Sequence, residues 1–224
     1  RTTTIVSFSN DPDANKNYGP FTPGFLKVPY NDIEALEKVL ADGSDVAAFL
    51  IEPIQGEAGV FVPDEGYLKK AYDLCKKNNV LFIADEVQTG IARTGKMLAC
   101  DHQGVKPDIL VLGKALSGGM YPVSAVLAND EVMKVIKPGQ HGSTFGGNPL
   151  ACAVACAALD VIIEDKLAEN AQKMGELFRA EMQKIIAETD LVTAVRGKGL
   201  LNAILINDTP ESSTAWDICL ALKE

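Results

Sequence analysis

The sequence has little positive charge and contains no long hydrophobic run. Its 224 residues include 21 Lys and Arg against 30 Asp and Glu, which gives a net charge of −9 at pH 7. A chain this acidic, without a basic stretch, lacks the phosphate contacts that nucleic-acid binding requires. A membrane-spanning helix needs about 20 consecutive apolar residues, and no such stretch occurs. We therefore expect neither a nucleic acid nor a membrane among its partners.

Cysteine and histidine are also scarce. The five Cys residues form no CxxC pair, and His102 and His141 lie far apart, so no metal site is expected. An odd cysteine count without a paired framework is typical of a reducing intracellular compartment, here the cytoplasm or the mitochondrial matrix. The sequence starts at Arg1 rather than Met and ends within an expected helix. We therefore expect an interior piece of a longer protein, with any targeting region outside it.

The composition, with 47% hydrophobic and 23% charged residues, is typical of a globular protein. Short apolar runs that alternate with amphipathic stretches predict an α/β domain. Strands are expected at residues 46–51, 80–84, 108–112 and 121–128, with helices near 31–41 and 64–75. Continuous runs such as VAAFLI and VLFIA are typical of strands that are buried on both faces of a sheet. We predict a mostly parallel sheet with helices on both faces.

The two ends of the sequence carry weaker signals. The β-branched segment 2–9 predicts a short strand, and Asn31 with Glu34 predicts the capping box of the following helix. Beyond the sheet, Asn148 and Pro149 predict a helix start. A second helix and two short strands are then expected at 166–188, 192–195 and 200–206. We divide the chain into a large domain (1–165), a connecting helix (166–189) and the start of a small C-terminal α/β domain (190–224).

Polar residues lie at the ends of three predicted strands: Glu52 and Asp85 come directly after theirs, and Lys114 follows the third after Gly113. In open α/β sheets, ligands bind outside the carboxyl ends of the strands. Lys114 has three interpretations: a solvated loop lysine, the lysine of a phosphate loop, or a partly desolvated amine that forms a Schiff base. The second fails, because Asp108 and Ala115 stand where that motif needs Gly and Ser or Thr.

Asp85 also has more than one interpretation. A carboxylate at a strand end can cap a helix or bind a metal ion. It can also pair with the ring nitrogen of pyridoxal phosphate, which needs such a partner to act as an electron sink. Together with Lys114, Asp85 therefore gives a moderate indication of pyridoxal-phosphate chemistry.

Longer motifs make the sequence recognisable. They are IEPIQGEAGV (51–60), FIADEVQTGIARTGK (82–96), PDILVLGKALSGG (107–119), HGSTFGGNPLAC (141–152) and VRGKGLL (195–201). On these motifs the sequence resembles the class III, fold type I pyridoxal-phosphate aminotransferases, and within that class it is most similar to the ornithine aminotransferases. The motifs cover most of the chain in matching order. The resemblance implies a fold type I large domain and pyridoxal 5'-phosphate as cofactor.

The resemblance also implies residue roles for the cofactor. Lys114 would hold it covalently and move a proton between substrate and cofactor, and Asp85 would pair with the pyridine nitrogen. Gln88 would bind the phenolic oxygen. Thr144, assisted by Ser143, would bind the phosphate in the site of the other subunit, so the resemblance implies a homodimer with shared active sites.

For substrates, the resemblance implies that Glu57 adapts the site to an ω-amino donor or a dicarboxylate, and that Arg1 binds the substrate carboxylate. The implied reaction transfers the δ-amino group of ornithine to 2-oxoglutarate, which gives glutamate 5-semialdehyde and glutamate. One alternative is another class III enzyme, acting on acetylornithine or 4-aminobutyrate. The other is a non-catalytic nucleotide-binding module, which the lack of a GxGxxG motif disfavours.

Overall fold

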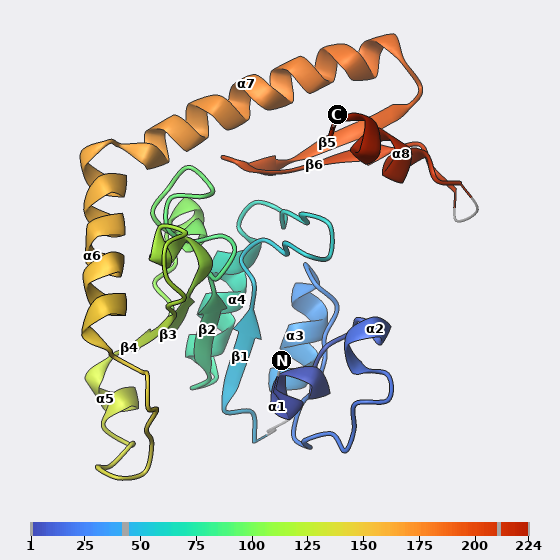
Figure 1. The fold of residues 1–224 in the computed structure, drawn as a ribbon. Coiled ribbons are helices and arrows are strands. Elements are labelled where there is room, and N and C mark those ends of the chain that lie inside the picture. Colours follow the sequence, from blue (N-terminus) through green and yellow to red (C-terminus); the bar gives the residue numbers. More distant parts are fainter. Residues whose placement is uncertain (1, 42–44, 210–211, 224) are drawn as a thin grey trace. The chain divides into compact units, whose positions relative to one another are not determined.

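The computed structural model describes residues 2–41, 45–209 and 212–223. The chain divides into two units, residues 1–44 and residues 45–224. No helix of the described residues is long and apolar enough to cross a membrane. Figure 1 shows the order of the elements along the chain.

The first unit is helical. It contains α1 (Thr3–Ser7), α2 (Pro12–Asn15) and α3 (Ile33–Ala41). The strand predicted at 2–9 is wrong, because the Thr2 side chain accepts a hydrogen bond from Ile5 N and caps α1. A side-chain cap of this kind outweighs the modest strand preference of β-branched residues.

The cap predicted for α3 is wrong by one residue. The Asp32 carboxylate accepts a hydrogen bond from Ala35 N at 2.9 Å, whereas Asn31 lies before the helix with a φ of 65°. Both side chains favour the N-cap position, so composition alone does not separate them.

The second unit is built on a four-stranded sheet with the order β1-β2-β3-β4. The strands are β1 (Ala48–Ile51), β2 (Leu81–Asp85), β3 (Ile109–Leu112) and β4 (Ala125–Ala128). The first three strands are parallel and β4 is antiparallel to β3, so the predicted mostly parallel sheet is confirmed. Helix α4 (Tyr67–Lys77) packs against β2, with the rings of Tyr72 and Phe82 5.7 Å apart.

Helices continue the chain beyond β4. They are the short α5 (Asp130–Met133), α6 (Pro149–Glu164) and α7 (Leu167–Glu188). Two 3-10 turns, η1 (Ala99–Gln103) and η2 (Lys114–Ser117), lie before β4. The predicted start of α6 is confirmed, because Asn148 Oδ1 accepts a hydrogen bond from Ala151 N at 2.9 Å. Ala155 and Leu159 of α6 pack against Leu116, so α6 supports η2.

The C-terminal part forms a second, two-stranded sheet. β5 (Val192–Lys198) and β6 (Leu201–Ile206) are antiparallel, and α8 (Thr214–Ala221) follows them. Both predicted strands are confirmed, and β5 continues three residues beyond its predicted end. Figure 1 shows α7 running alongside this strand pair.

Candidate functional site

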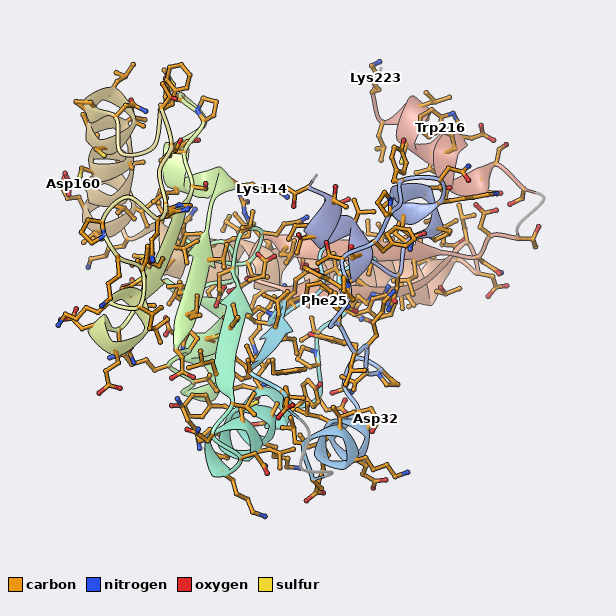
Figure 2. All side chains as sticks on the ribbon, turned by 90° about the horizontal axis from the view of Figure 1, so that it is seen from below. Phe25, Asp32, Lys114, Asp160, Trp216 and Lys223 are labelled. Carbon is orange, nitrogen blue, oxygen red and sulfur yellow. The ribbon has the colours of Figure 1, made fainter. Side chains whose placement is uncertain are left out.

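The parallel register brings the predicted polar residues to one edge of the sheet. Ile51 pairs with Ala84, and Asp85 pairs with Val111, so β1, β2 and β3 end side by side. Glu52 follows the first of these ends, Asp85 closes the second, and Lys114 follows the third. Figure 2 shows the Lys114 side chain at this edge.

The backbone at Lys114 is unusual. Its φ of 43° lies in the left-handed region, which residues with a Cβ atom rarely adopt. The residue begins η2, which Ser117 closes: Ser117 Oγ donates to Lys114 O at 3.0 Å and accepts from Gly119 N at 3.1 Å. Backbone strain of this kind gathers at functional sites, where the surrounding structure holds it in place.

An open cavity of ≈ 450 Å³ adjoins Lys114. It is lined by Lys114, Ser117, Pro122, Val123 and Ser124. One interpretation of Lys114 was a partly desolvated amine, but its side chain is exposed in this chain. The cavity leaves room for a ligand beside the amine.

The two acids at the end of β2 differ in environment. Asp85 is partly buried, and its Oδ1 accepts a hydrogen bond from Val87 N at 3.0 Å. Within the described part of the chain, no hydrogen bond is made to Asp85 Oδ2. Glu86 is fully buried and accepts hydrogen bonds from Thr89 Oγ1, Ala99 N and Cys100 N at 2.5 to 3.0 Å. Asp85 can therefore bind a ligand, whereas Glu86 holds η1 in place.

Gln88 and Glu57 are in direct contact. Gln88 Nε2 donates to Glu57 Oε1 at 2.7 Å, although the residues are 31 positions apart. Gly56 makes this arrangement possible, since a Cβ atom there would lie 2.1 Å from Gln88 Oε1. The amide predicted to bind a cofactor and the acid predicted to face the substrate therefore form one unit.

Glu52 joins the same group of charges. Burial raises the pKa of its carboxyl above the ordinary value, and the negative charges of Asp85 and Glu57 add to this effect. A hydrogen bond from Gly56 N at 3.1 Å and the positive charge of Lys114 oppose it. Glu52 therefore caps the following loop and also lies within electrostatic range of Lys114.

Other predicted site residues lie elsewhere. Ser143 and Thr144 are exposed in the segment between α5 and α6, where Ser143 Oγ accepts a hydrogen bond from Gly146 N at 3.0 Å. Because β4 is antiparallel to β3, this segment begins at the opposite edge of the sheet from Lys114. Neither residue lines the cavity beside Lys114. Arg1 lies outside the described residues.

Sequence reasoning did not assign roles to Ser117 or Arg196. Ser117 follows Lys114 by three residues, and its place before two glycines was the available signal. Arg196 reaches the loop of Glu57 across 137 positions, a contact that no local pattern indicates. Within the described residues, no group of three or more His, Cys, Asp or Glu is placed to hold a metal ion.

Comparison with known proteins agrees with this geometry. The ornithine aminotransferase of Drosophila ananassae mitochondria is 62% identical over all of this chain and 50% of its own length. The structure of an acetylornithine aminotransferase from Elizabethkingia anophelis is 73% identical, with a TM-score of 0.89 over all of this chain and 54% of its own. An ornithine aminotransferase structure from Toxoplasma gondii ME49 is 51% identical, with a TM-score of 0.94 over all of this chain and 52% of its own.

The chain spans about half the length of these relatives. Their structures confirm the predicted fold type I architecture. The model of the family described as aminotransferase class-III matches residues 1–224, so the chain belongs to the class-III aminotransferases.

Proposed function

We propose that the protein containing this chain is a pyridoxal-phosphate-dependent aminotransferase that uses ornithine as amino donor and 2-oxoglutarate as acceptor. The observation that carries the proposal is the strained Lys114 beside an open cavity, at the same sheet edge as Asp85. Ornithine transfer would yield glutamate 5-semialdehyde and glutamate.

The residues present fit pyridoxal phosphate. The Lys114 amine can bind an aldehyde, Asp85 Oδ2 can accept a hydrogen bond from a ring N–H, and the Gln88 amide can donate to a phenolic oxygen. An ornithine aminotransferase structure from Toxoplasma gondii, 53% identical to this chain, is described with partial occupancy of PLP at its active site. When bound, this cofactor supplies an electron sink for the carbon that loses a proton.

The chain's own groups would then divide the work. Lys114 Nζ is the base that removes the proton and later returns it, since it is the amine placed at the cavity. Asp85 is the acid at the neighbouring strand end, where it would pair with the ring nitrogen. Glu57 presents a negative charge to the substrate side, which favours a cationic amine.

The proposed enzyme acts as a homodimer. Thr144 and Ser143 lie in a segment that starts at the opposite sheet edge from Lys114, so they serve a site of another copy. Large apolar side chains are exposed in this segment and α6, at Ile136, Phe145 and Leu150, and in the stretch from η2 to β4, at Met120 and Val126. A second subunit would remove them from water.

Domain limits and compartment belong to the same proposal. We place the large domain at 1–165, the connecting helix at 166–189 and the start of the small domain at 190–224. Several relatives are named mitochondrial ornithine aminotransferases. We therefore place the enzyme in the mitochondrial matrix or, as the alternative, in the cytoplasm.

A second donor, N-acetylornithine, is favoured by one observation. The 73% identical structure is named an acetylornithine aminotransferase, whereas curated relatives at 55% to 62% identity are named ornithine aminotransferases. Both donors carry a free δ-amine, and they differ at the α-amine. Comparing kcat/KM for the two with the full-length protein decides between them, and a preference for N-acetylornithine of tenfold or more, about 1.4 kcal/mol, would replace our first choice.

The cofactor assignment is tested by borohydride reduction of the full-length protein, followed by peptide mass mapping. We expect a pyridoxyl adduct on Lys114 and on no other lysine. A Lys114→Ala variant supplied with the cofactor is the control, and it should yield no adduct. A folded, cofactor-supplied protein without an adduct at Lys114 would refute the proposal.

A further inference from the structure

The residues after β1 form a closed loop that carries Glu57. Gln55 and Phe61 exchange two backbone hydrogen bonds, at 3.1 and 2.9 Å, and Val60 N donates to Gly56 O at 3.0 Å. We call residues 55–61 the Glu57 loop. Because its two ends are bonded to each other, the Glu57 loop is a closed unit, and the position of the Glu57 backbone depends on how this unit is held.

Arg196 of β5 holds this loop from the other side. Its Nε donates to Gly59 O at 2.8 Å, and its guanidinium carbon lies 3.9 Å from the centroid of the Phe61 ring. Gly59 is closely covered, since a Cβ atom there would lie 3.0 Å from Arg196 Nη2. A planar guanidinium can stack and donate at once, which a lysine ammonium cannot do. Figure 1 shows the loop after β1 next to the β5–β6 pair.

Arg196 is itself fixed by backbone packing. A Cβ atom on Gly199 would lie 2.4 Å from the carbonyl carbon of Thr94, and one on Gly175 would lie 1.8 Å from Gly199 O. Leu200 N donates to Arg93 O at 2.9 Å, which joins the turn between β5 and β6 to the turn at 93–95. The base of Arg196 is therefore anchored, and its side chain restrains the loop.

The opposite side of the loop meets the candidate site. Glu57 Oε1 accepts from Gln88 Nε2, and the Glu57 and Lys114 charges both act on Glu52. A carboxylate at this place attracts a cationic amine and repels a second carboxylate. The distance between the Glu57 carboxylate and the bound substrate therefore changes the affinities for amine donors and for dicarboxylate acceptors in opposite directions.

We propose that Arg196 is a positioning residue that sets the balance between amine donor and dicarboxylate acceptor, by holding the Glu57 loop against Gln88. This inference rests on the proposed function. A purely structural Arg196 would instead fasten β5 to the rest of the unit, and its loss would weaken the whole protein without changing this balance.

The first arm of the test measures the loop directly. Amide hydrogen exchange is compared between wild-type full-length protein and Arg196→Lys, both free of cofactor. We expect about tenfold faster exchange of the peptide covering residues 55–61, with α4 and β2 unchanged. Arg179→Lys is the matched control, because Arg179 Nη1 donates to Gly199 O at 3.1 Å, in the β5–β6 turn. Equal acceleration in both variants, or none in Arg196→Lys, would overturn the proposal.

The second arm measures selectivity with the loaded enzyme. The ratio of kcat/KM for ornithine to that for 2-oxoglutarate should change about threefold or more in Arg196→Lys, and not in Arg179→Lys. In a Glu57→Gln background, the same Arg196→Lys change should leave the ratio unaltered, because the effect passes through Glu57. A shift that persists without the Glu57 charge, or an unchanged ratio alongside faster loop exchange, contradicts the positioning role.

The two arms also separate this inference from the proposed function. If borohydride trapping finds no adduct on Lys114, the proposed function fails, while the exchange arm still reports whether Arg196 holds the loop. If the adduct forms and the loop exchanges as in wild type, the positioning role fails alone.

Discussion

At the scale of single residues, the contact between Gln88 and Glu57 depends on Gly56, because a side chain at Gly56 would occupy the space that Gln88 fills. Gln88 lies where a side chain on Gly56 would stand, and this contact aligns its amide with Glu57. The φ of Gly56 is outside the left-handed region, so alanine can adopt its backbone conformation. Replacement at Gly56 therefore tests the contact rather than the backbone.

Gly56→Ala should keep the fold and displace Gln88, because the clash is with the end of a flexible side chain. We expect cofactor affinity to fall about tenfold, roughly 1.4 kcal/mol, because the displaced Gln88 amide loses its proposed hydrogen bond to the phenolic oxygen. Thermal stability should change little. Titration of the cofactor-free protein measures it. The control is a double-mutant cycle: in a Gln88→Ala background, Gly56→Ala should cost almost nothing more. Full additivity would show that Gly56 acts elsewhere.

Cys75 makes a residue-scale prediction about pH. Its side chain is fully buried, and burial raises the pKa of its thiol from 9.0 to about 11, with the Asp108 charge adding and Lys76 opposing. Below pH 9 the thiol is neutral in both the folded and the unfolded state, so its contribution to stability is complete. Between pH 9 and 11 the unfolded state releases its proton first, and that contribution is lost.

Unfolding free energy should therefore decline from pH 8 to pH 10.5, and less steeply in Cys75→Ala. The expected difference in decline is about 1 to 2 kcal/mol, obtained from denaturant titrations at both pH values. Cys219→Ala, which removes an exposed thiol, should keep the wild-type decline. Identical declines in all three proteins would mean that the Cys75 thiol does not contribute.

The sequence predicted features that depend on neighbouring residues, but not contacts between residues that are far apart in the chain. Glu52, Asp85 and Lys114 were placed correctly at one edge because strands that alternate with helices predict a parallel sheet, in which the carboxyl ends of the strands share an edge. Glu86 directly follows Asp85 in the sequence, and its burial depends on hydrogen bonds from backbone N–H groups of η1. Contacts of that kind come from tertiary packing and leave no local periodicity to find.

At the scale of elements, α7 and the β5–β6 turn are in close backbone contact, and the Arg179 side chain of α7 also donates to Gly199 O. A Cβ atom on Gly175 of α7 would lie 1.8 Å from Gly199 O, and one on Gly199 would lie 2.4 Å from the carbonyl carbon of Thr94, so neither position has room for a side chain. Gly199 also has a φ of 54°, which favours glycine on its own. This contact fixes the strand that bears Arg196.

Gly175→Ala should destabilise the protein although alanine is the better helix former. Helix propensity alone would stabilise the folded protein by up to about 1 kcal/mol. Forcing a methyl group into the backbone contact costs about 1 to 3 kcal/mol and pushes α7 away from the β5–β6 turn. We expect a net loss of about 2 kcal/mol in denaturant unfolding. Lys173→Ala, at an exposed position of the same helix, is the control and should be neutral or stabilising. A Gly175→Ala protein as stable as that control would contradict the packing described.

Element boundaries were predictable where burial and chain direction agreed, as in β1, β2 and β3. The segment at 2–9 was misassigned because its β-branched residues have only a weak strand preference, which the Thr2 cap outweighed. The two-stranded sheet was predicted from apolar runs around Arg196, but its docking through Gly199 was not. Close backbone approach depends on partners far apart in the sequence, here at residues 93–95 and 175.

At the scale of the whole molecule, one chain does not bring every proposed site residue together. Lys114 lies at the carboxyl edge of β1 to β3, whereas the segment of Thr144 begins at the opposite edge. In a symmetric dimer, each site can combine Lys114 of one subunit with Thr144 of the other. In the proposed dimer, the cofactor phosphate would then be bound by residues of both subunits.

Mixed dimers test this arrangement. Lys114→Ala and Thr144→Ala subunits are unfolded together and refolded, so that hybrids form. In a shared-site dimer, each hybrid contains one site with both defects and one site with none, because the intact Lys114 and Thr144 come from different chains. Random assortment at equal amounts should restore about a quarter of wild-type activity, well above that of either parent. If Thr144 served its own subunit, every site in a hybrid would keep one defect, and activity would not exceed the average of the two parents.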